Sequence, residues 1–229
     1  EFSEWHNQTL KEEDHESIAY WEQRGASLKD SKSVSIFQPL NADGRQNAFF
    51  QLNFDKKETT ELLEFCTTNS LDKECFALTV WSLVITQYLG FDQHLAIGRV
   101  ATGRSLEYFD YIIGPMARTL PLQFLLEEDM TFGQCYAQIE AEVRQSEERQ
   151  DYFDDLGRNF PISFEYATQS DLEEMIDKKK VQISATKSTN AFARLKLTCH
   201  WTDQLTFELQ YDANSLAAEG VKCLCAQLR

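Results

Sequence analysis

Hydrophobic and polar residues alternate in several stretches of the chain, and this period of two predicts β-strands whose successive side chains point to opposite faces. The alternation runs through residues 48–54 and 162–166. It is clearest near the end of the chain, in residues 193–201 and 205–211. These two stretches predict an antiparallel hairpin with one face packed and the other wet. A further short strand is expected at residues 181–185.

Two predicted helices begin with a capping box, in which the N-cap residue and the residue three positions later bond each other's backbone. Asp55 with Glu58 has this spacing, and so has Thr131 with Gln134. The helix after Thr131 carries an apolar stripe and is expected to end near Arg149. The helix after Asp55 is expected to turn three side chains inward, those of Leu62, Leu63 and Cys66.

Residues 75–89 are apolar on nearly every side, which predicts a helix at the centre of the core. Other helices are expected at 14–25, with Gly25 as a stop, and from about 215 to 229. Residues 26–47 are expected to be a polar connector, and residues 171–180 a charged helix or loop. Together these elements predict an α/β fold. We expect a two-layer sandwich, in which a mixed, largely antiparallel sheet has helices packed on one face.

The stretch from Leu95 to Leu126 combines two strand-like apolar runs with an irregular connection, and it holds three of the nine glycines. Three arginines, Arg99, Arg104 and Arg118, lie at or near the ends of the runs. Arginine is costly to bury without a partner, so each either forms a salt bridge with one of the 37 acidic residues or binds a phosphate or carboxylate.

Composition excludes several classes of partner. The formal net charge of −15 argues against nucleic acid, because phosphates are bound through clustered lysines and arginines. No apolar run has the length of a membrane span, and the first residues lack the pattern of a signal peptide. We therefore expect a cytoplasmic protein without a membrane partner, whose six cysteines are reduced core residues.

The sequence contains no obvious general base and no metal site. None of the four histidines has a spacing typical of zinc, Ser-His or Cys-His sites, and His200 falls on the polar face of the predicted hairpin. No nucleophile elbow, phosphate-binding loop or dinucleotide fingerprint is present. Any chemistry that needs a general base must therefore obtain it from elsewhere.

Five segments, in the same order along the chain, resemble the condensation domains of nonribosomal peptide synthetases, in the chloramphenicol-acetyltransferase-like superfamily. The family patterns are D-F-A-x-W, G-x-P-V-A-G-R, I-G-x-F-V-N-T-L-P-L-R, H-Q-D-Y-P-F-E and R-N-P-L-F. The matching residues are 1–5 (EFSEW), 97–104 (IGRVATGR), 113–123 (IGPMARTLPLQ), 150–152 (QDY) and 158–162 (RNFPI).

The resemblance implies a fold of two similar lobes with the active site in a tunnel between them. The family's general-base histidine belongs to an H-H-x-x-x-D-G motif of the N-terminal lobe, and this motif is absent here. Residues 1–229 are therefore expected to be the C-terminal lobe without its N-terminal lobe. By the resemblance, Gly114, Met116, Arg118 and Thr119 would line the substrate tunnel, and a further set would be structural or tunnel-wall residues: Arg99, Arg104, Gln150 and Asp151.

Three single residues depart from the family pattern. Arg118 replaces the usual Asn, Gln123 replaces the closing Arg, and Arg149 replaces the usual His. The change at 118 introduces a permanent cation where the family has a neutral group. Either the substrate differs, or an acidic neighbour neutralises the charge, or the intact domain is catalytically altered.

The resemblance implies amide-bond formation in the intact enzyme, between a donor aminoacyl or peptidyl thioester and the amine of an acceptor aminoacyl thioester. No cofactor is expected to bind directly, because the substrates travel on the phosphopantetheine arms of carrier proteins. The expected partners are the missing N-terminal lobe, peptidyl carrier proteins and an adjacent adenylation domain.

Three alternatives remain open: a noncatalytic condensation-like module that binds a carrier or tailoring protein, an epimerisation domain, and a heterocyclisation domain. The sequence 1–229 alone is expected to be inactive. It is also expected to expose a large apolar patch on the face that would meet the missing lobe.

Overall fold

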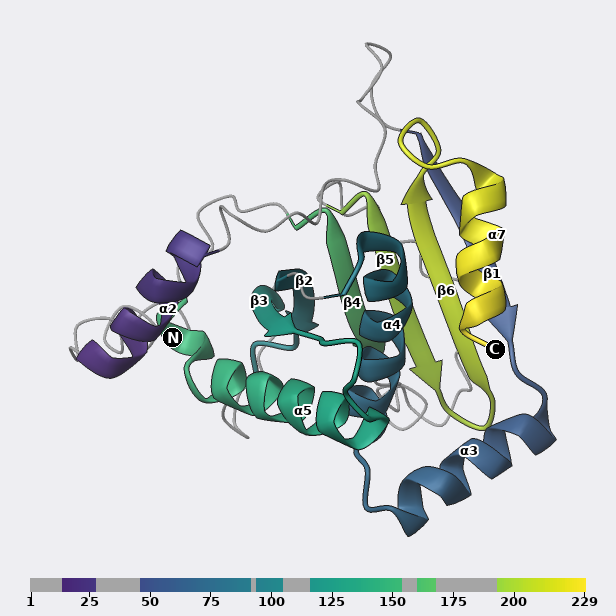
Figure 1. Ribbon diagram of the computed structural model, residues 1–229, viewed down its shortest axis with the longest axis horizontal. Coiled ribbons are helices and arrows are strands. Elements are labelled where there is room, and N and C mark those ends of the chain that lie inside the picture. Colours follow the sequence, from purple (N-terminus) through teal and green to yellow (C-terminus); the bar gives the residue numbers. More distant parts are fainter. Residues whose placement is uncertain (1–13, 28–45, 92–93, 105–115, 154–159, 168–192) are drawn as a thin grey trace, which may run out of the picture.

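A mixed sheet forms the frame of the molecule. The computed structural model describes residues 14–27, 46–91, 94–104, 116–153, 160–167 and 193–229. The strands are β1 (Asn47–Asn53), β2 (His94–Ala101), β3 (Arg118–Leu125), β4 (Ile162–Ala167), β5 (Leu195–Trp201) and β6 (Leu205–Asp212). Within the described residues they form one six-stranded sheet in the order β1-β6-β5-β4-β2-β3 (Figure 1). β4 is parallel to both neighbours and the other pairs are antiparallel, which confirms a mixed, largely antiparallel sheet.

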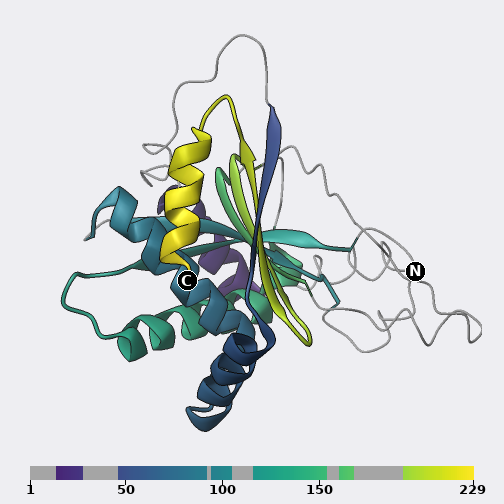
Figure 2. The same ribbon diagram turned by 90° about the vertical axis from the view of Figure 1, so that its right-hand side faces the viewer.

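The main helices cover one face of this sheet. The helices are α2 (His15–Ser27), α3 (Lys56–Thr68), α4 (Lys73–Leu89), α5 (Phe132–Glu148), the 3-10 turn η3 (Gln150–Tyr152) and α7 (Ala218–Gln227). Figure 2 shows α3, α4, α5 and α7 on the same side of the sheet. The two-layer sandwich expected from the sequence is therefore confirmed.

The core lies between α4 and the central strands. Leu78, Trp81 and Ile85 of α4 are fully buried, and so are Ile97 of β2 and Phe164 of β4. This confirms that the helix predicted over residues 75–89 is central. The capping boxes are also confirmed, because Asp55 and Thr131 accept from the backbone N–H groups of Glu58 and Gln134, whose side chains bond back.

Some sequence-based expectations are wrong in detail. Leu63 is 38 % exposed. The inner face of α3 is formed by Thr59, Leu62 and Cys66, and Leu63 comes one residue after Leu62, which turns its side chain about 100° away from that face. α2 continues to Ser27, past the expected stop at Gly25. The last helix begins only at Ala218. The elements expected at 171–180 and 181–185 lie outside the described residues.

The hairpin formed by β5 and β6 is packed on one face as predicted, but its other face is not uniformly wet. Lys196 and Gln210 are both buried on that face and are cross-strand neighbours. The Lys196 ammonium forms an ion pair with Glu165 of the adjacent strand β4, so its charge is compensated within the sheet. Lys196 is therefore a buried structural cation, which alternation alone does not reveal.

Over the described strands, the face opposite the helices carries no large apolar patch. Phe49 of β1 is exposed there, but its neighbours on the same face are polar, among them Gln51 and Glu208. Apolar patches that mark interfaces are contiguous and cover several hundred Å². Within the described residues, the expected exposed apolar face is therefore not found.

Candidate functional site

A close backbone approach joins the end of β2 to the start of β3. Gly103 has a φ of +68°, and a Cβ atom on it would lie 1.8 Å from the Met116 carbonyl oxygen. Only glycine fits this position, because the left-handed conformation and the neighbouring carbonyl both exclude a side chain. Met116, one of the expected tunnel residues, is buried at this contact.

Arg118 connects the first residue of β3 to the turn that follows α5. It lies opposite Ala101 in the β2–β3 ladder, and its Nη1 donates to the Gln150 carbonyl oxygen at 2.9 Å. The structure thus joins two segments that the sequence separates by 32 positions. Among the described residues, the partner of this half-buried guanidinium is a backbone carbonyl and not a carboxylate.

An aromatic cluster packs beside this connection and holds α2 against the body. Trp21 is buried with Ala101, Leu120 and Phe153, and its ring lies 4.7 Å from that of Phe153. The indole Nε1 of Trp21 donates to the Arg149 carbonyl oxygen at 2.7 Å. One aromatic side chain therefore supplies both the apolar contact and the polar anchor of α2.

Charged groups reinforce the attachment of α2. Arg149 forms an ion pair with Glu16 at 3.1 Å and lies 5.0 Å from the centre of the Tyr20 ring. Arg24 forms an ion pair with the buried carboxylate of Glu142. Burial raises the pKa of Glu142, while hydrogen bonds from the Gln123 backbone and Arg24 act in the opposite direction. Arg149, which stands where the family has His, thus takes part in intramolecular packing.

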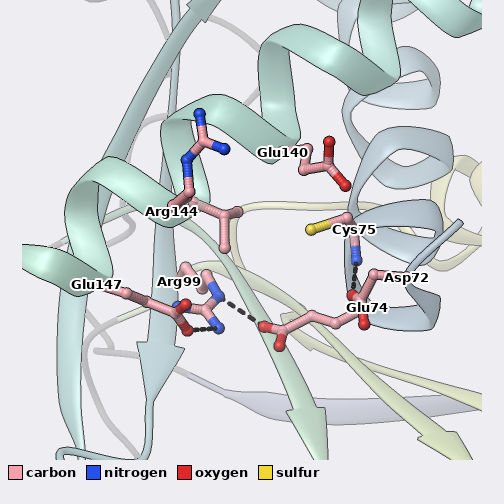
Figure 3. Close-up of a pocket in the computed structure, with 8 residues that line it drawn as sticks. Asp72, Glu74, Cys75, Arg99, Glu140, Arg144 and Glu147 are labelled. Atoms are coloured by element: carbon pink, nitrogen blue, oxygen red, sulfur yellow. Dashed lines mark hydrogen bonds and ion pairs between the residues drawn. The ribbon is translucent and has the colours of Figure 1, made fainter. Parts of the chain in front are cut away.

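Arg99 points from β2 into the space between α4 and α5. It lies on the same face of the sheet as Arg118, because Arg118 pairs with Ala101, two residues further along β2. Its Nε and Nη2 atoms each lie 2.6 Å from a carboxylate oxygen, of Glu74 and Glu147 respectively (Figure 3). Burial alone would lower the pKa of Arg99, but the hydrogen bonds and charges of these two glutamates raise it above its usual range. Of the two possibilities left open by the sequence, the salt bridge is thus the one present at Arg99.

A pocket of about 220 Å³ opens above Arg99. It is lined by Asp72, Glu74, Cys75, Arg99, Glu140, Val143, Arg144 and Glu147. Burial raises the pKa of the Cys75 thiol, which is therefore neutral and a poor nucleophile near neutral pH. Within the part of the chain that the structure describes, no group of His, Cys, Asp or Glu has the arrangement of a metal site.

The remaining candidate residues are dispersed. Thr119 faces the opposite side of the sheet from Arg118 and pairs with Val100. Arg104 and Asp151 are half-buried, Gln150 is buried, and Gly114 lies outside the described residues. The structure therefore brings together Met116, Arg118 and Gln150 at one end of β2 and β3. Arg99 lies on the same face of the sheet but bonds Glu74 and Glu147, whereas Thr119 lies on the opposite face.

Sequence reasoning did not identify the acidic partners of Arg99 or the role of Phe153. Glu74 and Glu147 are two of many acidic residues on helices, and no local signal distinguishes them. Phe153 follows a three-residue turn, and no local pattern in the sequence predicts that it packs against Trp21. Trp21 was detectable, because an aromatic residue within an amphipathic helix predicts an anchor.

The architecture is an α/β sandwich in which family-like segments meet at the β2–β3 end. The condensation-domain family model matches residues 1–229, and the chain belongs to this family. It is 22 % identical over 223 residues to bacitracin synthase 3 of Bacillus licheniformis and 24 % identical over 146 residues to gramicidin S synthase 2 of Aneurinibacillus migulanus. These matches cover 89 % and 62 % of the chain, but only 3 % of each relative.

Solved structures share the fold. The X-domain in complex with OxyB from teicoplanin biosynthesis gives a TM-score of 0.76 at 18 % identity, covering 99 % of this chain and 55 % of that one. The epimerization domain of tyrocidine synthetase B gives a TM-score of 0.70 at 14 % identity, and the match covers 100 % of this chain and 57 % of that one. The chain thus spans little more than half of each structure. No helix among the described residues is both long and apolar enough to cross a membrane.

Proposed function

We propose that the chain is the C-terminal lobe of a nonribosomal peptide synthetase condensation domain that forms amide bonds in the intact enzyme. The acceptor amine attacks the donor thioester carbonyl, the carbon–sulfur bond breaks, and the donor's phosphopantetheine thiol leaves. A base on the other lobe accepts the proton lost by the amine and passes it to the departing sulfur, which leaves as the thiol. The family match over the whole chain supports this proposal, as does the coverage of about half of each related structure.

The observation that carries the proposal is the hydrogen bond from Arg118 to the Gln150 carbonyl. It brings two family segments together beside Met116, at the end of β2 and β3 that leads to Gly114. In the proposed tunnel these residues form one wall, and Thr119 contributes from the other side of β3. Arg104 and Asp151 are proposed to support this wall, and Arg99 is proposed to anchor it from the same face of the sheet as Arg118.

The proposed partners follow from the reaction. Carrier proteins deliver both substrates on phosphopantetheine arms, an adjacent adenylation domain loads the carrier, and the N-terminal lobe supplies the base. The lobe binds no cofactor directly and works in the cytoplasm. Positioning and electrostatic support of the developing oxyanion are the contributions that this wall can make.

The test uses the full-length protein that contains residues 1–229, with aminoacyl-loaded donor and acceptor carriers. We expect dipeptidyl carrier to form with the intact protein and not with residues 1–229 alone. Arg118→Asn, which introduces the family residue, is expected to retain product formation, whereas Gly103→Val should abolish it by displacing Met116. Peptide-bond formation by the isolated 229-residue chain would refute the assignment as a half-domain.

A second candidate is a noncatalytic module that recruits a carrier or tailoring protein. It is favoured by Arg149, because the residue at the family's histidine position is used for contacts with Glu16 and Tyr20. The two candidates differ in the segment before residue 1 of the full-length protein. An intact H-H-x-x-x-D-G motif with turnover supports catalysis, whereas a degenerate motif with carrier binding and no turnover supports recruitment.

A further inference from the structure

The pocket above Arg99 lies between the start of α4 and the second half of α5 (Figure 3), and neither Arg118 nor Gln150 lines it. Its volume of about 220 Å³ is smaller than that of pockets for drug-sized ligands. The pocket therefore suits a group about the size of one amino acid. The inference drawn from it does not depend on the proposed function.

The charges that line the pocket favour a cation. Four carboxylates, of Asp72, Glu74, Glu140 and Glu147, face two guanidinium groups, a formal balance of −2. Arg99 uses one oxygen of Glu74 and one of Glu147, and no hydrogen bond of the described residues engages the second oxygen of either. Glu147 is 46 % exposed, so its second oxygen is accessible to a ligand.

Two donors in the same pocket lack acceptors. The Arg99 side chain is only 5 % exposed, and the described residues give its Nη1 no hydrogen-bond partner. A buried charged donor without a partner is costly, which indicates that an acceptor belongs there. Arg144, on the α5 side, has no hydrogen-bond or ion-pair partner among the described residues. A matching ligand thus presents an oxygen acceptor as well as a positive charge.

We propose that this pocket binds an α-amino carbonyl group, meaning a primary ammonium one carbon away from a carbonyl or carboxylate oxygen. Glu140 and Glu147 hold the ammonium, and Arg144 donates to the oxygen. Nη1 of Arg99 is closed off from solvent, so it becomes a second donor to this oxygen only where the pocket lining rearranges on binding. Binding is noncovalent, because the Cys75 thiol is buried and neutral.

Two sources carry this chemistry, and net charge distinguishes them. An aminoacyl amide or ester carries one positive charge, whereas a free amino acid is a zwitterion with none. Because the lining has a balance of −2, the aminoacyl derivative is expected to bind more tightly than the free amino acid. The probes are L-alaninamide, L-alanine and N-acetyl-L-alaninamide, which keeps the carbonyl and lacks the ammonium.

Binding is measured by saturation-transfer NMR and calorimetric titration of the 229-residue chain near neutral pH. L-Alaninamide is expected to bind, and N-acetyl-L-alaninamide is not. Tighter binding of L-alanine than of L-alaninamide would also support the α-amino carbonyl class, and would identify the free amino acid as its source. Equal binding of L-alaninamide and its N-acetyl derivative, or no binding of any probe, would overturn the proposal.

Variants locate the site. Glu140→Gln removes one carboxylate charge and is expected to weaken L-alaninamide binding about fivefold. Arg144→Gln should weaken L-alanine more than L-alaninamide, because it removes a partner of the full carboxylate. Glu219→Gln on α7, paired with the exposed Lys222, is the matched control and leaves binding unchanged. If Glu140→Gln and Arg144→Gln both bind the probes like the unmodified chain, the site is refuted. Thermal unfolding confirms that each variant is folded.

Discussion

Removal of the Arg99 charge tests how the sheet is joined to the two helices above it. In Arg99→Gln the side chain stays polar, but two carboxylates lose the guanidinium that lies 2.6 Å from each of them. Glu147 is 46 % exposed and regains hydration, whereas Glu74 is only 20 % exposed and keeps most of its burial. The loss of unfolding free energy therefore comes mainly from the buried Glu74 charge, which is left without its partner.

Removal of one partner from a buried ion pair costs about 3–5 kcal/mol. Because one of the two carboxylates rehydrates, we expect Arg99→Gln to lose ~3 kcal/mol of unfolding free energy, at the lower end of that range. The double variant Arg99→Gln/Glu74→Gln removes the stranded charge as well. It is expected to be more stable than the single variant by ~1 kcal/mol.

Urea denaturation followed by far-UV circular dichroism measures both differences. Arg229→Gln, which removes an exposed ion pair with Glu58, is the control and should leave the transition midpoint nearly unchanged. A loss below about 1 kcal/mol for Arg99→Gln would show that the ion triad is not a stabilising connection. A double variant less stable than the single one would refute the argument from the stranded Glu74 charge.

Two further predictions concern backbone strain and a buried acid. Gly103→Ala forces a side chain into a φ of +68° and against the Met116 carbonyl. We expect it to lower the free energy of unfolding, measured by urea denaturation, by at least ~2 kcal/mol. The control is Gly133→Ala on α5, which meets no atom within 4 Å and should be neutral or stabilising. Burial raises the folded-state pKa of Glu142 above its ordinary 4.5, so its protonated form favours folding. The free energy of unfolding should therefore fall as pH rises from 4.5 through the folded-state pKa, and then level off. Glu142→Gln should flatten that decline when unfolding is measured across pH. A pH profile of the variant identical to that of the unmodified chain would contradict this role of Glu142.

Several features of the fold are predictable because their causes are local. The capping boxes at Asp55 and Thr131 set the starts of α3 and α5, since the bonded groups are three residues apart. The alternation in β5 and β6 predicts their pairing, because a period of two with a short turn permits little else. Family resemblance likewise depends on short segments, and the whole-chain family match confirms it.

Other features depend on residues that are distant in sequence. Leu62 and Leu63 are both apolar, and only the contact surface of α3 determines which of them is covered. Lys196 is buried beside Glu165 because β4 and β5 are parallel neighbours, which strand patterns do not reveal. The burial of Leu62 and of Lys196 therefore depends on which helices and strands pack together.

For the candidate site, the sequence determined that Gly103, Arg118 and Gln150 belong to recognisable segments. Only the tertiary structure decided that Arg118 reaches the Gln150 carbonyl and that Arg99 lies between Glu74 and Glu147. The physical reason is that hydrophobic periodicity and caps act over a few residues, whereas a buried charge is compensated by groups that folding brings within about 3 Å. Sequence therefore specified the elements and the family, and packing chose the partners of the arginines.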